Sequence, residues 1–173
     1  RRDGENANSA LLVGVNPEDF EDDSVFAGCE LQRKIEQKAY NIANGAVPVT
    51  TVGNFVFGKE IRLGRVKPTV KPDCVLTDFS RIYPDFIVES LKDGIKEMDK
   101  KISGFADFDA VITAPETRSS SPVRIVRKDT GESTAFDGIY PCGEGAGYAG
   151  GITSAAMDGL KVAEAILKKF KIK

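Results

Sequence analysis

The sequence predicts an α/β fold with α+β character: a mixed sheet, two amphipathic helices and a C-terminal segment in which a glycine-rich loop leads into a further helix. Short runs of β-branched and apolar residues predict the strands, and longer segments with apolar residues at every third or fourth position predict the helices. The loop is marked by closely spaced glycines, which permit sharp backbone turns: Gly143, Gly145, Gly147, Gly150 and Gly151.

The N-terminal elements are a strand followed by a helix. Residues 9–15 form an apolar run before Asn16 and Pro17, which predicts a buried strand ending in a turn. Residues 28–44 have a helical period, and Asn44-Gly45 suits the C-terminal cap of that helix. We expect its apolar face to consist of Leu31, Ile35, Ala39 and Ile42.

The central part is predicted to contain a strand, a loop and a second helix. Residues 47–57 favour an irregular strand, and residues 62–78 favour an extended loop. A helix is predicted over residues 84–103, because Pro84 suits a first helical turn and Gly104 suits a helix end. We expect its apolar stripe to consist of Ile87, Leu91, Ile95, Met98 and Ile102.

The C-terminal part is predicted to begin with short strands over residues 109–113, 121–128 and 138–141. A turn over residues 129–131 separates the last two, and the glycine-rich loop then leads into a helix over residues 152–170. On that helix we expect an inward-facing stripe that includes Val162, Ala163 and Ile166.

The composition limits the classes of function. The chain has 173 residues, 41% of them hydrophobic, which suffices for one domain or for one domain and part of another. A formal net charge of −2 indicates neither a nucleic-acid partner nor a membrane partner. The chain has no histidine, which excludes from it a Ser-His triad and most zinc sites, and we predict no metal site. Its dispersed cysteines and the lack of a signal-peptide pattern favour a cytoplasmic location.

Three blocks of sequence resemble one family. Residues 143–151, together with residues 154–159, are similar to the C-terminal flavin-contacting segment of a bacterial family of FAD-dependent dehydrogenases, which is related to the glutathione-reductase-like flavoproteins. Residues 113–125 and residues 2–10 resemble the same family. The resemblance implies that residues 1–108 form a substrate-type domain and that residues 109–173 form the C-terminal segment of an FAD-binding domain.

The flavoproteins that this chain resembles begin with a Rossmann unit whose G-x-G-x-x-G turn holds the FAD pyrophosphate. The chain has no such Rossmann unit at its N-terminus, and it begins at Arg1 instead of Met. We therefore interpret it as the C-terminal part of a longer FAD-dependent oxidoreductase, whose missing N-terminal Rossmann part is its partner. Alone, we expect this part to be inactive, to hold no FAD and to expose apolar surface that can drive dimerisation.

The resemblance assigns the flavin contacts to the glycine-rich loop and to the helix start. It implies that Glu144 accepts a hydrogen bond from a ribityl hydroxyl; the alternative is an exposed carboxylate in a turn. The helix-start N–H groups are expected to face the flavin N1/C2=O edge, where negative charge gathers on reduction; the alternative is a turn packed for topology alone. The expected cofactor-binding set is Gly143, Glu144, Gly145, Gly150, Gly151, Ile152 and Thr153.

Glu116, Arg118 and Tyr148 are the candidates for substrate binding, while the substrate itself and the catalytic residues are not identified by the sequence. Arg118 can clamp a carboxylate with two parallel hydrogen bonds, or it can form an ion pair between domains. Tyr148 can stack near the flavin, or it can be a buried, hydrogen-bonded tyrosine. An alternative from another class is a non-catalytic module that binds an anion or a protein with the same loop and helix start.

Overall fold

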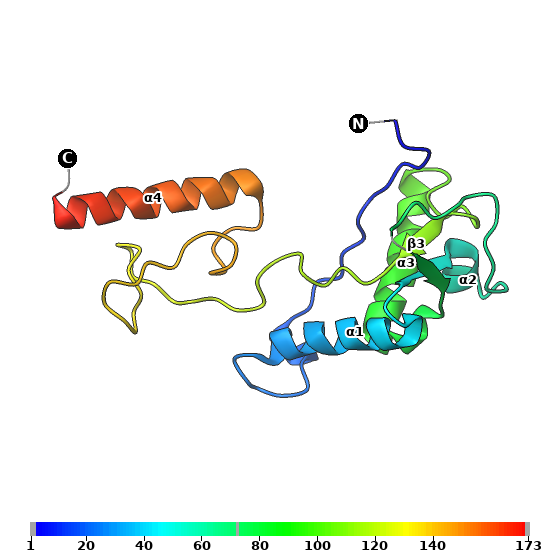
Figure 1. The fold of residues 1–173 in the computed structure, drawn as a ribbon, viewed down its shortest axis with the longest axis horizontal. Helices are drawn as coiled ribbons and strands as arrows, with labels where there is room; N and C mark the ends of the chain where they lie inside the picture. The colour runs from blue at the N-terminus through cyan, green and yellow to red at the C-terminus, as the bar shows by residue number, and fades with distance from the viewer. Residues whose placement is uncertain (1–2, 72, 172–173) are drawn as a thin grey trace. The chain divides into compact units, whose positions relative to one another are not determined.

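The computed structural model describes residues 3–71 and 73–171, so Pro72, within the predicted loop over residues 62–78, lies outside the described residues. The chain divides into two compact units (Figure 1). The first comprises Arg33–Pro115 and the segment that ends at Asp19; the second comprises Phe20–Gln32 and the segment that begins at Glu116. The seam predicted near Phe108, and the roles given to the segments on its two sides, stay predictions.

The first unit contains a small mixed sheet, as the sequence predicted. Its strands are β1 (Val47–Thr51), β2 (Cys74–Leu76) and β3 (Val111–Thr113), and they lie in the order β2-β1-β3. Strand β1 pairs in parallel with β2, with Val49 opposite Leu76, and in antiparallel fashion with β3, with Thr50 opposite Ile112. Val49 and Thr50 of this central strand point to opposite faces of the sheet, and both are fully buried, so both faces are covered at this point.

Two long helices belong wholly or partly to this unit and agree with the sequence. Helix α1 (Ala27–Ala43) begins in the second unit and ends in the first, where Asn44 and Gly45 adopt positive φ as the cap prediction requires. Helix α3 (Asp85–Lys101) follows Pro84 and buries Ile87 and Ile95. Ile102 was expected on its stripe, but the helix ends before this residue and leaves it exposed. The fully buried side chains of the unit include Val49, Thr50, Phe79, Ile82 and Ile95.

Two predictions for this unit are wrong. Residues 47–57 do not continue as one strand, because the Thr51 side chain accepts a hydrogen bond from the backbone N–H of Asn54 and starts a short helix, α2 (Val52–Phe57), at the end of β1. Residues 9–15 form no strand, and Leu12 is exposed. An apolar run becomes a strand only where another strand pairs with it, and residues 9–15 are not part of the three-stranded sheet. Short 3-10 turns occupy Pro17–Asp19 and Phe79–Arg81.

The second unit contains helix α4 (Ile152–Phe170), whose bounds match the prediction. Residues 121–128 and 138–141 do not form the predicted strands, and the one pairing recorded in this region is an isolated bridge between Arg127 and Ser133. The turn between them is present, with the N–H of Lys128 donating to the carbonyl of Glu132. The described part of this unit therefore has extended segments without a sheet to join.

The buried stripe of α3 makes a testable contribution to stability. We expect Ile95→Ala to lower the free energy of unfolding by about 2–5 kcal/mol, because it opens a cavity beneath a side chain that is 1% exposed. Ile102→Ala is the matched control, since Ile102 is 52% exposed, and we expect it to cost less than about 0.5 kcal/mol. Urea unfolding followed by circular dichroism measures both; equal losses would show that the stripe is misplaced.

Candidate functional site

The glycine-rich loop lies between the extended segment over residues 121–128 and the start of α4. Within the loop, the N–H of Gly147 donates to the carbonyl of Glu144 at 2.9 Å, and the N–H of Tyr148 donates to the carbonyl of Gly143 at 3.1 Å. Gly147 has φ +80°, and a β-carbon at this position would lie 2.6 Å from the carbonyl oxygen of Val123. The close approach of the two backbones therefore requires glycine at 147.

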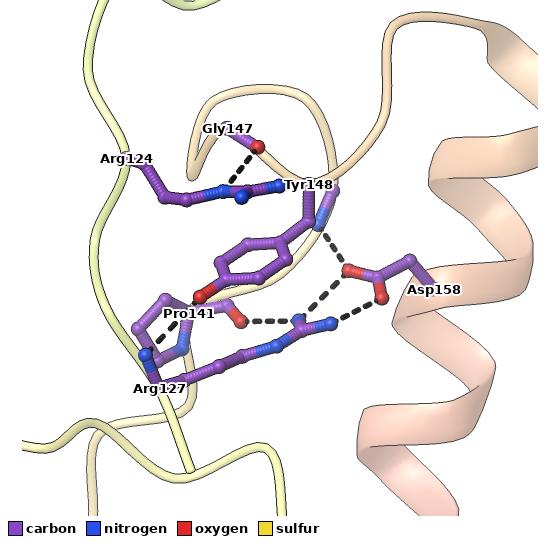
Figure 2. Close-up of polar contacts among 7 residues, drawn as sticks. Arg124, Arg127, Pro141, Gly147, Tyr148 and Asp158 are labelled. Atoms are coloured by element: carbon purple, nitrogen blue, oxygen red, sulfur yellow. Dashed lines mark hydrogen bonds and ion pairs between the residues drawn. The ribbon is translucent and has the colours of Figure 1, made fainter. Parts of the chain in front are cut away.

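A largely buried ion pair ties this loop to α4. Both guanidinium nitrogens of Arg127 donate to Asp158, with Nη1 at 2.9 Å from Oδ2 and Nη2 at 2.6 Å from Oδ1 (Figure 2). Nη1 also donates to the carbonyl of Pro141 at 2.8 Å, and Asp158 Oδ2 accepts from the backbone N–H of Gly143 at 2.9 Å. Through Arg127 and Asp158 together, the ion pair thus holds the extended segment and both ends of the short stretch from Pro141 to Gly143 that leads into the loop.

This environment changes the titration of both partners. The Arg127 guanidinium, followed by the backbone N–H of Gly143, lowers the pKa of Asp158 from 3.8 to about 2. The hydrogen bonds to Asp158 raise the pKa of Arg127. Since each group favours the charged form of the other, the pair stays ionised at neutral pH.

Tyr148 lies between two guanidinium groups. Figure 2 shows its ring between Arg124 and Arg127, whose guanidinium carbons lie 4.6 Å and 3.6 Å from the ring centroid. Its hydroxyl accepts a hydrogen bond from the backbone N–H of Arg127 at 3.1 Å, and the Nε of Arg124 donates to the carbonyl of Gly147 at 3.0 Å. With a cation on each face, Tyr148 supports the loop. Its contact with a substrate or a flavin stays a prediction.

Glu144 lies in the exposed part of the loop together with Gly145. Within residues 3–71 and 73–171, its carboxylate has no hydrogen-bond partner. Both interpretations of Glu144 fit this position, because an exposed acceptor can contact a ribityl hydroxyl or only water. The ribityl contact stays a prediction.

The start of α4 is exposed, as an anion-facing or flavin-facing helix end must be. Gly151 is the N-cap, and the Oγ of Ser154 accepts from the Gly151 N–H at 3.1 Å and donates to the Gly151 carbonyl at 3.0 Å. Gly150, Ile152 and Thr153 are exposed around this cap. The first N–H groups of a helix have no acceptor within the helix, so those of Ile152 and Thr153 are the donors available here.

The two charged substrate candidates lie elsewhere in the second unit, on the exposed segment that follows Pro115. Glu116 and Arg118 are both exposed, and the intervening Thr117 accepts a hydrogen bond on its carbonyl from Nε2 of Gln32 at 2.9 Å. This hydrogen bond joins the backbone at Thr117 to helix α1. Their role in substrate binding stays a prediction.

A second charged cluster holds the other end of α4 and was not anticipated. The sequence places Glu132 beside a turn, where we expected it to face solvent, but the structure buries it. Its Oε1 accepts from the N–H of Gly138 at 2.8 Å and from Lys169 Nζ at 2.5 Å, and these contacts lower the pKa of Glu132, the Gly138 N–H contributing most. The expectation was wrong because the end of α4 covers the turn.

Arg127 and Asp158 are the residues that sequence reasoning missed. A signal was present, since Asp158 precedes Val162 by four positions and therefore lies on the same inward face of α4. A lone carboxylate on an apolar helical stripe indicates a buried ion pair, because a buried charge needs a partner.

The ion pair predicts acid sensitivity of the second unit. Because the pKa of Asp158 in the folded state lies below 3.8, its ionised form stabilises the fold fully above about pH 4 and loses this effect as the pH falls through about 2. We expect Asp158→Asn and Arg127→Gln to remove the same part of the pH dependence of unfolding. Urea unfolding at successive pH values between about 5 and 2 measures this. Identical acid slopes in wild type and Asp158→Asn would contradict the assignment.

Comparisons with known proteins relate the chain to flavin-dependent proteins. A family model described as "FAD-dependent protein, C-terminal domain-like" matches residues 1–119. A protein of Clostridium beijerinckii, described as an uncharacterized protein, is 47% identical over 174 residues, which is 99% of this chain but 33% of that protein. The chain therefore spans about a third of the length of the relative that it matches.

The described residues lack the features of a metal site and of a membrane-spanning helix. In the part of the chain that the structure describes, no three His, Cys, Asp or Glu side chains are grouped to hold a metal ion. Among the residues that the structure describes, no helix has both the length and the hydrophobicity of a membrane-spanning segment.

Proposed function

The chain belongs to the FAD-dependent protein, C-terminal domain-like family, and on that premise we propose that it is part of an FAD-dependent dehydrogenase. In this proposal it supplies the substrate-side domain and the contacts to the flavin ribityl chain and N1 edge. The pyrophosphate is held by the remainder of the longer protein, since the G-x-G-x-x-G spacing at residues 145–150 directly follows no strand among the described residues, as a Rossmann turn does. The free thiols Cys29, Cys74 and Cys142 support a reducing, cytoplasmic compartment.

The observation that carries the proposal is the link between Asp158 and Gly143. Asp158 lies in the first half of α4, and its Oδ2 accepts from the N–H of the residue directly before Glu144 at 2.9 Å. Gly143, next to the exposed Glu144, is thus hydrogen-bonded to the same helix at whose start the exposed residues Ile152 and Thr153 lie. A positioned acceptor beside a positioned set of donors fits a flavin, whose ribityl chain donates and whose ring edge accepts.

The residues present therefore fit the cofactor. Bound FAD supplies the hydride chemistry. Glu144 accepts from a ribityl hydroxyl and orients the chain, while the N–H groups of Ile152 and Thr153 donate toward the N1/C2=O edge and favour negative charge there. Gly143, Gly145, Gly150 and Gly151 let the backbone approach the ring closely. Glu116, Arg118 and Tyr148 are proposed to line the substrate side.

The role of Glu144 can be measured as flavin retention by the full-length protein after dialysis. We expect Glu144→Ala to weaken FAD binding by about tenfold to hundredfold, because it removes a charge-assisted hydrogen bond worth about 1.5–3 kcal/mol. Glu144→Gln should lose less, since its amide oxygen still accepts. Glu164→Ala is the matched control, because Glu164 is an exposed glutamate on α4 beyond the loop. Equal retention of FAD by Glu144→Ala and wild type would show that Glu144 is an exposed turn residue that does not contact the ribityl chain.

The proposal also predicts that FAD binding needs more than this chain. The full-length protein should show a flavin absorption spectrum, whereas titration of FAD into the isolated chain should show little or no binding, because in this proposal the Rossmann turn that holds the pyrophosphate belongs to the remainder of the protein. A micromolar dissociation constant for the isolated chain, which corresponds to a binding free energy of about −8 kcal/mol, would show that FAD binding does not require the rest of the protein.

The exposed helix start also favours a second candidate, a non-catalytic module that binds an anion at residues 150–153. The two candidates differ in their cofactor. A full-length protein without flavin, whose isolated C-terminal chain binds inorganic phosphate, would support the anion-binding module.

A further inference from the structure

Helix α4 carries two apolar faces, and its own unit covers one of them. The covered face includes Val162, which is buried, and Ala155, Gly159 and Ile166, which are half-buried. Figure 1 shows residues of the same unit running along one side of the helix. Ala163 was expected to belong to this face, but it is exposed, so that part of the prediction was wrong.

The second face forms a continuous line of exposed residues, which we name the free stripe. At 100° per residue, its members fall within an arc of about 80° on one side of the helix. Ile152 is 94% exposed, Leu160 66% and Phe170 57%. The free stripe consists of Ile152, Ala156, Leu160, Ala163, Leu167 and Phe170.

The free stripe adjoins the covered face directly. Gly159 and Ile166, on the covered side, lie four positions before Ala163 and Phe170 of the free stripe and therefore neighbour them on the helix surface. Lys161, Glu164 and Lys168 lie on the third side of the helix. The apolar surface of α4 therefore runs without interruption from the core of the unit to its outside. Such a surface is typical of a domain core that has been divided, and not of an isolated patch.

Apolar side chains are also exposed elsewhere in the second unit. Ile125, Val126 and Ile139 are exposed and lie on the extended segments that form no strands in the described chain, and Phe136, in the bend between these segments, is exposed as well. A layer of helix and extended chain normally packs on a sheet, which buries the apolar side chains and pairs the backbone. The second unit lacks this sheet among its described residues.

We propose that the free stripe of α4 seats the FAD-binding remainder of the same polypeptide, an inference that rests on the proposed function. The chain spans 33% of its relative from Clostridium beijerinckii, so two thirds of that protein lie outside the match and are available to supply the missing layer. A second copy of the chain is the competing occupant. The continuity between the free stripe and the unit's own core favours the remainder, because it completes one core instead of joining two finished ones.

The test is thiol labelling of the full-length protein under native conditions, with Cys29, Cys74 and Cys142 replaced. Leu160→Cys places a thiol in the free stripe, and Met157→Cys is the matched control, because Met157 is 54% exposed on the same helix but lies outside the stripe. We expect Leu160→Cys to react with a maleimide at least about tenfold more slowly, since a covered thiol reacts only when the structure opens. Leu167→Cys should behave like Leu160→Cys, and circular dichroism confirms that each variant is folded.

Each outcome decides between the occupants. Equal labelling rates at positions 157 and 160 would show that the free stripe is exposed and would overturn the proposal. Protection that disappears when dilution converts a dimer into monomers would assign the free stripe to a second copy and would also overturn it. Protection in a monomer supports the proposal, and it does so whether or not the protein is yellow. Flavin content, measured separately, therefore tests the proposed function without deciding the docking surface.

Discussion

The ion pair between Arg127 and Asp158 is the interaction on which the candidate site depends. Arg127 donates to Asp158 and to the carbonyl of Pro141, while Asp158 also accepts from the N–H of Gly143. These contacts join α4, the glycine-rich loop and the extended segment, which form no sheet together. Removing one partner would leave a largely buried charge without compensation, which is far more costly than the loss of a surface ion pair. The Arg127 guanidinium also covers one face of the Tyr148 ring, so the same ion pair contacts a side chain of the loop.

The exposed residues of the candidate site lie next to residues that are held by hydrogen bonds. Glu144, Ile152 and Thr153 are exposed, but the residues next to them are tied down by hydrogen bonds to Asp158 and Ser154. A binding site needs its contacting groups free and their supports fixed, because freedom in the supports is lost on binding and weakens affinity. The cluster of Glu132 and Lys169 fixes the far end of α4 in the same way.

The two units differ in how complete they are. The first buries Val49, Phe79, Ile82 and Ile95 around a sheet whose central strand is paired on both sides. The second relies on ion pairs and leaves the free stripe of α4 in contact with solvent. Burial of apolar surface is the main favourable term in folding, so a unit with this much exposed apolar surface is expected to gain stability from a partner.

The elements whose hydrogen bonds are local could be predicted from the amino-acid sequence. Helices α1, α3 and α4 were predicted with nearly correct bounds, because a helix pairs each residue with one four positions away. Residues 9–15 and 121–128 were wrongly predicted as strands, since a strand exists only where a distant segment pairs with it. Tertiary structure alone decided that Glu132 is buried and that Asp158 meets Arg127. The environment of a carboxylate depends on what packs over it, and that information is not local in the chain.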